Sequence, residues 1–357
     1  GIRDFCLSRG SEMCIRDSLN ALSALLMKKG RAYSDIMTFA FWCRKASLLQ
    51  EKAKYDDISR RLGKGIVFHS TPSNVAVNFA FSFAAGMLSG NANIIRLPAK
   101  SFAQVDIICK AVNELLENGF SSMKPYILMV KFPTVKEIMD VFSATADARV
   151  IWGGDQTIFH VRQSPLKPRA NEITFADRHS LLVIDADAYL AADTKERIIQ
   201  DFYNDTYFSD QNACTAPRII FWKGVNISAA KKDFWGRVAQ KAGKEYNLTA
   251  VQAVGKLANF YKSAVCLDIA KTATPDNFVT RVQIRQLEPS VLDYKYNSGF
   301  FFEYDIQDLT EMLPVCNDKC QTITYFGIGK DDISHFIASA PHGVDPVSYT
   351  HLRAHET

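Results

Sequence analysis

Apolar and polar positions along the chain follow two alternating periods. Short apolar runs of the kind that form buried strands are separated by longer stretches in which apolar residues recur at helical spacing. The predicted strands are 66–68, 92–96, 126–132, 149–152, 181–184, 219–222, 300–304 and 322–326. The predicted helices are 74–88, 101–118, 134–143, 194–204, 229–244 and 250–266. Strands that alternate with helices in this way predict βαβ units and a mostly parallel sheet.

This pattern predicts an α/β fold of two domains. Residues 19–62 are rich in helix formers and predict a helical lead-in. We place a domain boundary near Asp187, because the rhythm of strands and helices changes there. The two expected domains are 63–187 and 188–346. Parallel sheets bind ligands at the carboxyl ends of their strands, so the turns after Phe68, Arg96 and Trp152 are candidate sites.

Both ends of the chain differ from the rest. Residues 1–18 show no clear helical or strand period, and residues 347–357 carry two His and no packing pattern. Both resemble peptides that arise when a sequencing adaptor is translated in frame at the end of a metagenomic contig, so we interpret them as adaptor-derived artefacts. Natural disordered tails are the alternative. Under the first interpretation residues 19–346 are native and form a fragment truncated at both ends.

Composition excludes several classes of protein. The 357 residues carry 42 Lys and Arg against 38 Asp and Glu, a net charge of +4, whereas dedicated nucleic-acid binders cluster a much larger basic excess. The longest uncharged run, 69–95, is broken by Asn and Ser, so no integral membrane segment is expected. Outside the two ends only Cys316 and Cys320 lie close together, and no second pair completes a zinc set. We therefore expect reduced thiols, a cytoplasmic location and no metal.

The most informative stretch is 208–218, which contains Cys214. Polar residues precede this Cys, small residues flank it, and a predicted strand follows. A structural Cys usually sits among large apolar residues and is inert, and Cys43, Cys109 and Cys266 have neighbours of that kind. Cys214 instead lies in a loop of small and polar groups that a substrate carbonyl could approach. It is therefore the candidate nucleophile.

The Cys214 loop resembles the nucleophile loop of the aldehyde dehydrogenase superfamily, and most closely that of the LuxC-type acyl-CoA reductases (long-chain fatty acyl-CoA reductases). Four more motifs are similar and occur in the family's order: a Pro-x-Asn turn, a Lys-Pro segment along the cofactor ribose, a turn below the pyrophosphate, and the segment leading into the catalytic domain. They match 69–75, 92–100, 150–155 and 175–187. The resemblance spans about 65–345. It implies a Rossmann-like parallel-sheet cofactor domain and an α/β catalytic domain with the nucleophilic Cys.

The resemblance implies a reductase that converts long-chain acyl-CoA into fatty aldehyde with NADPH. Cys214 would expel CoA to form an acyl-enzyme thioester, which hydride transfer turns into a thiohemiacetal that releases the aldehyde. The Cys214 backbone N–H and the Asn74 amide match the family's oxyanion donors, although Asn74 also suits a helix N-cap. Homo-oligomers of the full-length chain and an acyl-protein synthetase as partner are further implications.

Two departures from the family pattern sharpen the expectation. Aldehyde-oxidising relatives use a Glu in a Glu-Leu-Gly-Gly segment to activate water, and the region around Glu172 lacks that motif. This favours acyl transfer from CoA over aldehyde oxidation, although Glu172 could still reach the site. In NAD-preferring relatives a carboxylate follows the Lys-Pro pair, whereas here Arg96, Pro98 and Lys100 have no acid nearby. A 2′-phosphate gains from such cations, so NADPH is expected; a merely solvated Lys100 is the alternative.

The remaining signals are weaker. The turn at Gly153 and Gly154 is the expected pyrophosphate position, but it is no GxGxxG fingerprint. Asp155 would repel a pyrophosphate or cap the next helix. We expect His69 to be structural and the aromatic run 300–302 to be buried sheet rather than an acyl-chain contact. Two other functions stay open: a reductase of another thioester or an acyl phosphate, and a non-catalytic scaffold or inactive fragment.

Overall fold

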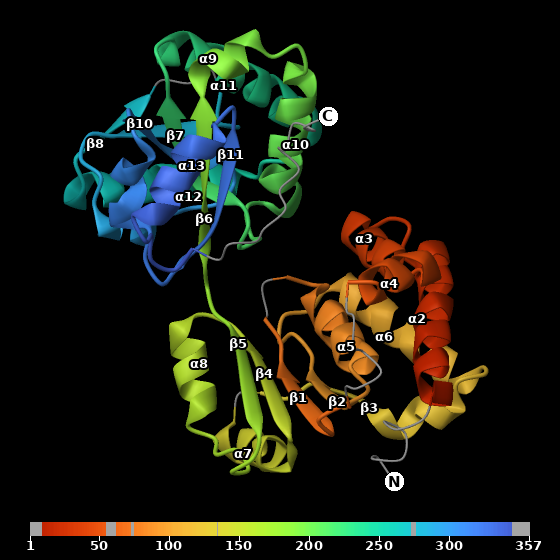
Figure 1. The fold of residues 1–357 in the computed structure, drawn as a ribbon. Coiled ribbons are helices and arrows are strands. Elements are labelled where there is room, and N and C mark those ends of the chain that lie inside the picture. The colour runs from red at the N-terminus through yellow and green to blue at the C-terminus, as the bar shows by residue number, and fades with distance from the viewer. Residues whose placement is uncertain (1–8, 55–61, 73–74, 134, 273–275, 345–357) are drawn as a thin grey trace. The chain divides into compact units, whose positions relative to one another are not determined.

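The computed structural model describes residues 9–54, 62–72, 75–133, 135–272 and 276–344, with only the backbone for 9–12 and 271. The chain divides into two compact units, 1–176 and 177–357, coloured red to yellow-green and green to blue in Figure 1. The boundary lies earlier than the one expected near Asp187. The reason is that strand β6 (His179–Asp185), expected to close the first domain, belongs to the sheet of the second unit.

The first unit opens with three helices, α2 (Arg9–Lys29), α3 (Ser34–Trp42) and α4 (Lys45–Lys52). They confirm the predicted helical lead-in. The expectation that residues 1–18 lack a helical pattern is wrong for 9–18, since α2 runs through them and buries Ile15 in the main core of this unit. An adaptor origin of 1–18 and 347–357 stays a prediction; residues 1–8 and the whole of 347–357 lie outside the described residues.

Five strands of the first unit form one parallel sheet in the order β3-β2-β1-β4-β5. They are β1 (Ile66–Ser70), β2 (Ala92–Arg96), β3 (Ile127–Val130), β4 (Ala148–Trp152) and β5 (Asn171–Phe175). The covering helices are α5 (Asn78–Leu88), α6 (Ala103–Glu117), α7 (Lys136–Thr145) and α8 (Asp155–Arg162). Helices α5 and α6 share a core with α2 around Phe79, whereas α7 and α8 pack on the other face around Phe68 and Ile151 (Figure 1). This confirms the Rossmann-like arrangement.

The second unit is built on a six-stranded sheet in the order β11-β6-β7-β10-β9-β8, parallel except between β8 and β9. Its other strands are β7 (Pro217–Lys223), β8 (Ile269–Thr272), β9 (Thr280–Ile284), β10 (Phe300–Ile306) and β11 (Cys320–Phe326). One face carries α9 (Ala186–Ala191), α10 (Lys195–Asp205) and α11 (Ile227–Glu245). The other carries α12 (Ala250–Cys266), α13 (Lys330–Ala338) and the 3₁₀ helices η4 (Pro289–Tyr294) and η5 (Leu309–Val315).

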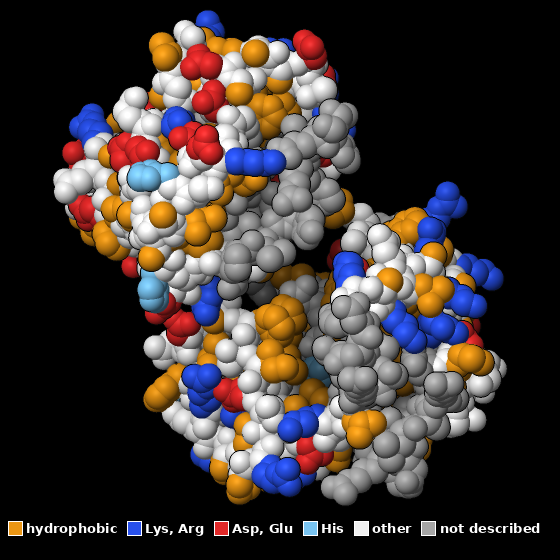
Figure 2. Space-filling model, in the orientation of Figure 1, with side chains coloured by type: hydrophobic (Ala, Val, Ile, Leu, Met, Phe, Trp, Pro, Cys, Tyr) orange, Lys and Arg blue, Asp and Glu red, His pale blue; other side chains and the backbone are white. Residues whose placement is uncertain are grey.

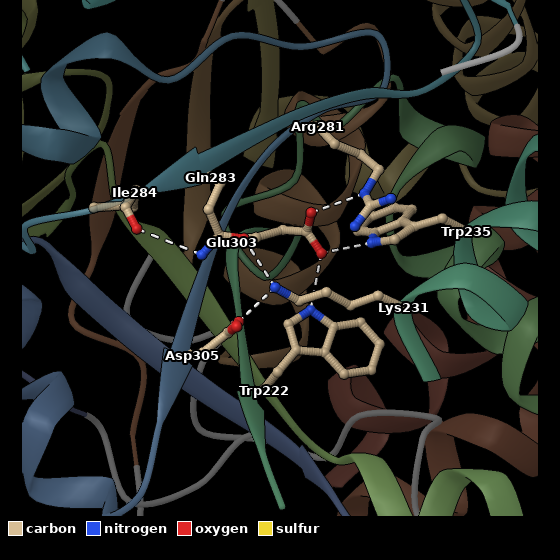
Figure 3. Close-up of polar contacts among 8 residues, drawn as sticks. All are labelled: Trp222, Lys231, Trp235, Arg281, Gln283, Ile284, Glu303 and Asp305. Carbon is tan, nitrogen blue, oxygen red and sulfur yellow. Dashed lines mark hydrogen bonds and ion pairs between the residues drawn. The ribbon is translucent and has the colours of Figure 1, made fainter. Parts of the chain in front are cut away.

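A carboxylate is buried in the core of the second unit. Glu303 of β10 is fully buried, and one of its oxygens accepts hydrogen bonds from the indole N–H groups of Trp222 at 2.9 Å and Trp235 at 2.7 Å (Figure 3). Its other oxygen accepts from Arg281 Nε at 2.8 Å. Removing one partner from such a buried charge typically costs about 3–5 kcal/mol. The cluster therefore fastens β7, β9 and α11 to β10.

Most predicted elements are confirmed, and α12 and β2 have the predicted bounds. The sequence did not indicate β5, β8, β9, α9 or α13, and of α8 it indicated only a helix that begins near Asp155. Strand β5 lies at the edge of its sheet, and its residues alternate between exposed and half-buried positions, so it lacks the apolar run that marks the other strands. The strands that position the candidate site, β1, β2, β4, β6, β7 and β10, were all predicted.

The surface of the described residues shows no large field of one charge on the face in view. Figure 2 shows Lys and Arg side chains scattered among Asp, Glu and apolar side chains there. No described helix is long and apolar enough to span a bilayer. The described part of the chain also holds no group of three or more His, Cys, Asp or Glu placed to bind a metal ion.

Candidate functional site

Three loops meet at the carboxyl edge of the first sheet. Strands β1, β2 and β4 end there at Ser70, Arg96 and Trp152, and the register sets Ser70 opposite Arg96 on one side and Ile151 on the other. The strand order reverses at β1, because β2 and β3 lie on one side of it and β4 and β5 on the other. In parallel α/β sheets a crevice opens at such a reversal and binds ligands.

The predicted Lys-Pro segment follows β2 at this edge. Thr71 Oγ1, after β1, donates a 2.5 Å hydrogen bond to the Arg96 carbonyl and so ties two of the three loops together. The Arg96 guanidinium lies 5.0 Å from the centre of the Phe132 ring, and burial lowers its pKa. Pro98 is buried, whereas Lys100 is exposed. The segment therefore presents one half-buried and one exposed cation at the carboxyl edge.

Gly153 and Gly154 join β4 to α8. A Cβ on Gly153 would lie 2.8 Å from Thr157 Cγ2, so the first turn of α8 requires a glycine there, whereas a Cβ on Gly154 would meet no atom within 4 Å. Gly154 is the N-cap of α8, so Asp155 is the first helical residue and not the cap. Backbone N–H groups at a helix start attract anions, and the exposed Asp155 carboxylate is the group that opposes one here.

A buried chain of hydrogen bonds lies under this edge. Trp152 Nε1 donates to Ser82 Oγ at 3.1 Å, and that hydroxyl lies 2.8 Å from His69 Nδ1. The other ring nitrogen, Nε2, lies 3.0 Å from Asn93 Oδ1. Burial lowers the pKa of His69 to about 4, although the bond to Asn93 works against this, so the ring is neutral near pH 7. Both ring nitrogens have partners, which confirms the structural role predicted for His69.

Asn74, the predicted oxyanion donor, lies outside the described residues. The helix that follows it, α5, begins at Asn78, and its N-cap is Val77. The alternative assignment of Asn74 as the N-cap of this helix is therefore wrong. Its role as an oxyanion donor stays a prediction.

Cys214 lies in the second unit, where the strands of the sheet begin. Its thiol is free and exposed in the loop between the 3₁₀ helix η3 (Tyr207–Ser209) and β7. Ser180 Oγ of the neighbouring strand β6 donates a 2.7 Å hydrogen bond to the Cys214 carbonyl. The backbone of the candidate nucleophile is thus tethered while its sulfur remains accessible, which is what attack on a thioester carbonyl requires.

Two turns with left-handed backbone lock together next to Cys214. Asp210 and Gln211 have φ of 49° and 53°, and Ser298 and Gly299 have φ of 63° and 81°. Such angles are rare for residues other than glycine, so they persist only where the surrounding contacts determine them. Gln211 Oε1 accepts from the Gly299 backbone N–H at 2.9 Å, and Ser298 Oγ donates to Asp210 Oδ1 at 2.9 Å. The two turns therefore hold each other in place.

Arg218, the second residue of β7, completes this arrangement, which we call the Arg218 clasp (210–211, Arg218 and 296–299). Its Nη1 donates to the Tyr296 carbonyl at 2.8 Å and to Asn297 Oδ1 at 2.9 Å, and its Nη2 donates to the Gln211 carbonyl. Burial lowers the pKa of Arg218 to about 10, so it stays charged at neutral pH. Because Cys214 lies between Gln211 and Arg218 in the chain, the clasp fixes both flanks of the nucleophile loop.

Glu172, in the first unit, is held by two arginines. Its Oε2 lies 2.6 Å from Arg149 Nη2 and its Oε1 lies 2.6 Å from Arg162 Nε. Burial raises its pKa, but the bonds to Arg162 and Arg149 outweigh burial and lower it overall. Glu172 is the second residue of β5, so it lies toward the edge opposite the one where Trp152 ends β4. This placement supports the expectation that it does not activate water.

The aromatic run 300–302, considered as an acyl-chain contact, is not part of the site. The aromatic run 300–302 is buried in β10, as expected, and offers no open surface to an acyl chain. The clasp was missed by sequence reasoning. The polar run before Cys214 was noted, but its bonds join residues 88 positions apart in the chain, which no local pattern reveals.

Known proteins resemble this chain in sequence. The family model described as acyl-CoA reductase (LuxC) matches residues 32–246, a stretch that includes both cofactor motifs and Cys214. A curated relative, the long-chain acyl-protein thioester reductase of Vibrio harveyi, is 25% identical over 166 residues, which make up 46% of this chain and 33% of that protein. The chain thus spans about a third of the length of the curated relative that it matches.

Solved structures resemble it in fold. An indole-3-acetaldehyde dehydrogenase in complex with NAD+ matches with a TM-score of 0.67 at 13% identity, over 96% of this chain and 77% of that one. A proline utilization A from Bradyrhizobium japonicum matches with a TM-score of 0.66 at 14% identity, over 96% of this chain and 40% of that one. The predicted aldehyde dehydrogenase-like fold is therefore confirmed.

Proposed function

The chain belongs to the acyl-CoA reductase (LuxC) family, and from this we propose that it reduces a long-chain acyl thioester to a fatty aldehyde with Cys214 as the nucleophile. The observation that carries the proposal is the exposed Cys214 thiol on a loop whose backbone is fixed by Ser180 and the Arg218 clasp. The proposed donor is acyl-CoA, and the proposed reductant is NADPH.

The proposed role of Cys214 has two stages. Its thiolate attacks the thioester carbonyl, the bond from the acyl carbon to the donor sulfur breaks, and the donor thiol leaves with a proton taken up from solvent. The oxyanion formed on the way is stabilised by the Cys214 backbone N–H and the Asn74 amide. When bound, the reduced nicotinamide supplies hydride to the acyl-enzyme. Collapse of the thiohemiacetal then releases the aldehyde and returns the Cys214 thiolate.

The carboxyl edge of the first sheet fits a dinucleotide. The space around Gly154 is open, and the α8 N-terminus begins there. Gly153 and Gly154 would carry the pyrophosphate, and Pro98 would line the ribose. Arg96 and Lys100 would favour the 2′-phosphate that distinguishes NADP from NAD. These residues hold and orient the cofactor. Glu172 is occupied by its two arginines, which supports the proposal that it does not activate water.

The second candidate function is the reduction of a different activated acyl group. The Vibrio harveyi relative is named an acyl-protein thioester reductase, which favours a protein-bound acyl donor and an acyl-protein synthetase as partner. A cytoplasmic location is proposed because the described cysteines are all free. Homo-oligomerisation stays a prediction.

The test is to trap a labelled acyl group on the protein. Incubating the wild-type chain with radiolabelled acyl-CoA and no reductant should leave label on Cys214, and later addition of NADPH should release it as aldehyde. Cys214→Ser should carry no thioester label, whereas Cys266→Ser, which changes another exposed thiol, should label normally. Equal labelling of Cys214→Ser would overturn the proposal. Labelling by an acyl phosphate or acylated protein, but by no acyl-CoA, would select the second candidate.

A further inference from the structure

Exposed apolar side chains gather on helix α12 of the second unit. Val251 is 80% exposed, Val254 68% and Val265 85%, and Leu257 and Tyr261 are exposed as well. Among the helices whose side chains are described, none of the others carries more than one exposed large apolar side chain. Single exposed apolar residues are ordinary, whereas a contiguous apolar surface of this kind marks an interaction site.

The face of α12 that packs on its own unit is largely polar. Lys256 is 2% exposed, and its ammonium donates to the Asn277 carbonyl. Asn259 Nδ2 donates to the Tyr294 carbonyl at 2.6 Å, and Ser263 is fully buried. A helix that buries polar groups and exposes apolar ones is the reverse of what water favours. This indicates that the outer face of α12 is covered in the functional protein.

The exposed apolar residues follow the spacing of a coiled-coil seam. Intervals of three, four, three and four residues separate Val251, Val254, Ala258, Tyr261 and Val265, all of them exposed, which we call the α12 stripe. Such a stripe packs on another of the same spacing, because each side chain enters a hole between four side chains of the facing helix. A second copy of α12 presents that spacing by identity, and a two-fold pair brings the same surface of both copies together.

Charge favours a second copy over a charged partner or a lipid surface. Lys256 and Lys262 are the two charged residues of α12; Lys256 is buried, and Lys262 Nζ lies 5.9 Å from the centre of the Tyr294 ring. The α12 stripe is therefore neutral and offers no counter-charge to an acidic or a basic segment. Helices that lie on membranes usually carry several Lys or Arg on their polar face, and α12 exposes one. A neutral stripe meets no charge repulsion from its own copy.

The area of the stripe is sufficient for a weak dimer. Burying one side chain of this size removes roughly 100 Å² of apolar surface from water. If the four large residues of the stripe and Leu257 are covered in both copies, the pair buries on the order of 1,000 Å². That is near the lower limit for a specific interface, so we expect a dissociation constant in the micromolar range.

We propose that the α12 stripe is a self-association surface, on which α12 of a second copy of the chain packs to form a dimer. The inference goes beyond the proposed function and does not depend on it, because no residue of the stripe takes part in the proposed chemistry.

Sedimentation equilibrium of the 357-residue chain tests this without catalysis. The wild type should show a monomer–dimer equilibrium. Val254→Glu/Tyr261→Glu places charges in the seam with a good helix former at both positions, and it should raise the dissociation constant at least about thirtyfold. Val254→Ile keeps the seam apolar and should stay within about threefold of wild type. So should the matched control Ile337→Glu, at a position of α13 that is 63% exposed.

Two further measurements separate loss of the interface from loss of the fold. At concentrations where the wild type is monomeric, urea unfolding of each variant should match the wild type, because the replaced side chains are exposed in the single chain. In a background without the exposed thiols, Cys214→Ser/Cys266→Ser, a short bismaleimide should link two copies of Ala258→Cys, since residue 258 is at the middle of the stripe. Ile337→Cys in the same background should not be linked.

Three results would overturn the inference. The first is a wild-type chain that stays monomeric at every concentration, and the second is a dimer that survives Val254→Glu/Tyr261→Glu, which would place the interface elsewhere. The third is a monomer that binds vesicles of phosphatidylcholine and phosphatidylglycerol and loses this binding in the double variant, which would assign the stripe to a lipid surface.

Discussion

The two units place their candidate chemistry at opposite edges of their sheets and build it from different parts of the chain. In the first unit the strands end at the site, and the useful groups are largely backbone: a glycine turn, a helix start and strand ends in register. In the second unit the strands begin at the site, and side chains of the Arg218 clasp fix the loop. A phosphate is bound by backbone N–H groups, and the arrangement of strands and helices in the first unit presents such groups. A nucleophile must be held in a fixed position, and in the second unit side-chain hydrogen bonds hold it.

The largest effect should come from the thiol itself. Cys214→Ser should lower aldehyde formation by about a thousandfold or more, because the hydroxyl is a far weaker nucleophile than a thiolate. Cys266→Ser should keep wild-type activity. The measurement is aldehyde release from acyl-CoA with NADPH. If Cys214→Ser retained its activity, the loop before β7 would not supply the nucleophile.

The clasp should be the next most sensitive feature. Arg218→Met leaves three oxygens without their donor, on Gln211, Tyr296 and Asn297, at a cost of about 3 kcal/mol in the free energy of unfolding. It should also lower kcat by about a hundredfold, since small displacements of a reacting group cost that much.

The control for the clasp is Arg285→Met, which removes an exposed arginine paired with Asp268 and should change stability by less than about 1 kcal/mol. Urea unfolding and kcat are the measurements. If Arg218→Met lost stability but kept kcat, the clasp would serve only the fold.

Acid should weaken both units through one buried histidine in each. The pKa of His69 and that of His179 are each lowered to about 4, chiefly by burial. The unfolded chain takes up protons below pH 6.5 and the folded one only near pH 4, so stability is complete above pH 6.5 and falls between 6.5 and 4. Each histidine should account for up to about 3 kcal/mol of that loss.

Urea unfolding at pH 7 and pH 4.5 measures this loss. His69→Gln and His179→Gln should each shrink the difference between the two values, whereas His342→Gln, at an exposed site, should not. An undiminished loss in both buried-site variants would show that other groups govern it.

The smallest effect should come from the exposed cation at the dinucleotide edge. Lys100→Glu should weaken NADPH about fivefold more than NADH, because exposed charge pairs are worth about 1 kcal/mol or less. Lys110→Glu, on the exposed side of α6, is the matched control and should alter neither. Equal weakening of both cofactors by Lys100→Glu would remove the reason for preferring NADP at this edge.

The fold was predictable where the hydrophobic pattern is local and strong. The helical pattern through Ile15, Leu19, Leu22 and Leu26 was also present, but it crosses residue 18, where the unusual composition of the chain's start hid it. Strand β5 escaped because exposed positions interrupt it.

The candidate site shows the same difference between features carried by neighbouring residues and features built from distant ones. Cys214 and the glycine turn carry their chemistry in neighbouring residues, so sequence was enough to find them. The clasp depends on contacts between distant segments and on left-handed backbone at Asp210 and Gln211, neither of which has a dependable local signature.

The carboxylate of Glu303 has a spectroscopic consequence. It binds the indole N–H groups of both tryptophans of the second unit, Trp222 and Trp235, while the other two of the four, Trp42 and Trp152, belong to the first. The buried pair shares one electrostatic environment that vanishes when that core opens. With Trp42 and Trp152 replaced by Phe, intrinsic fluorescence would follow the unfolding of the second unit alone, with no attached dye.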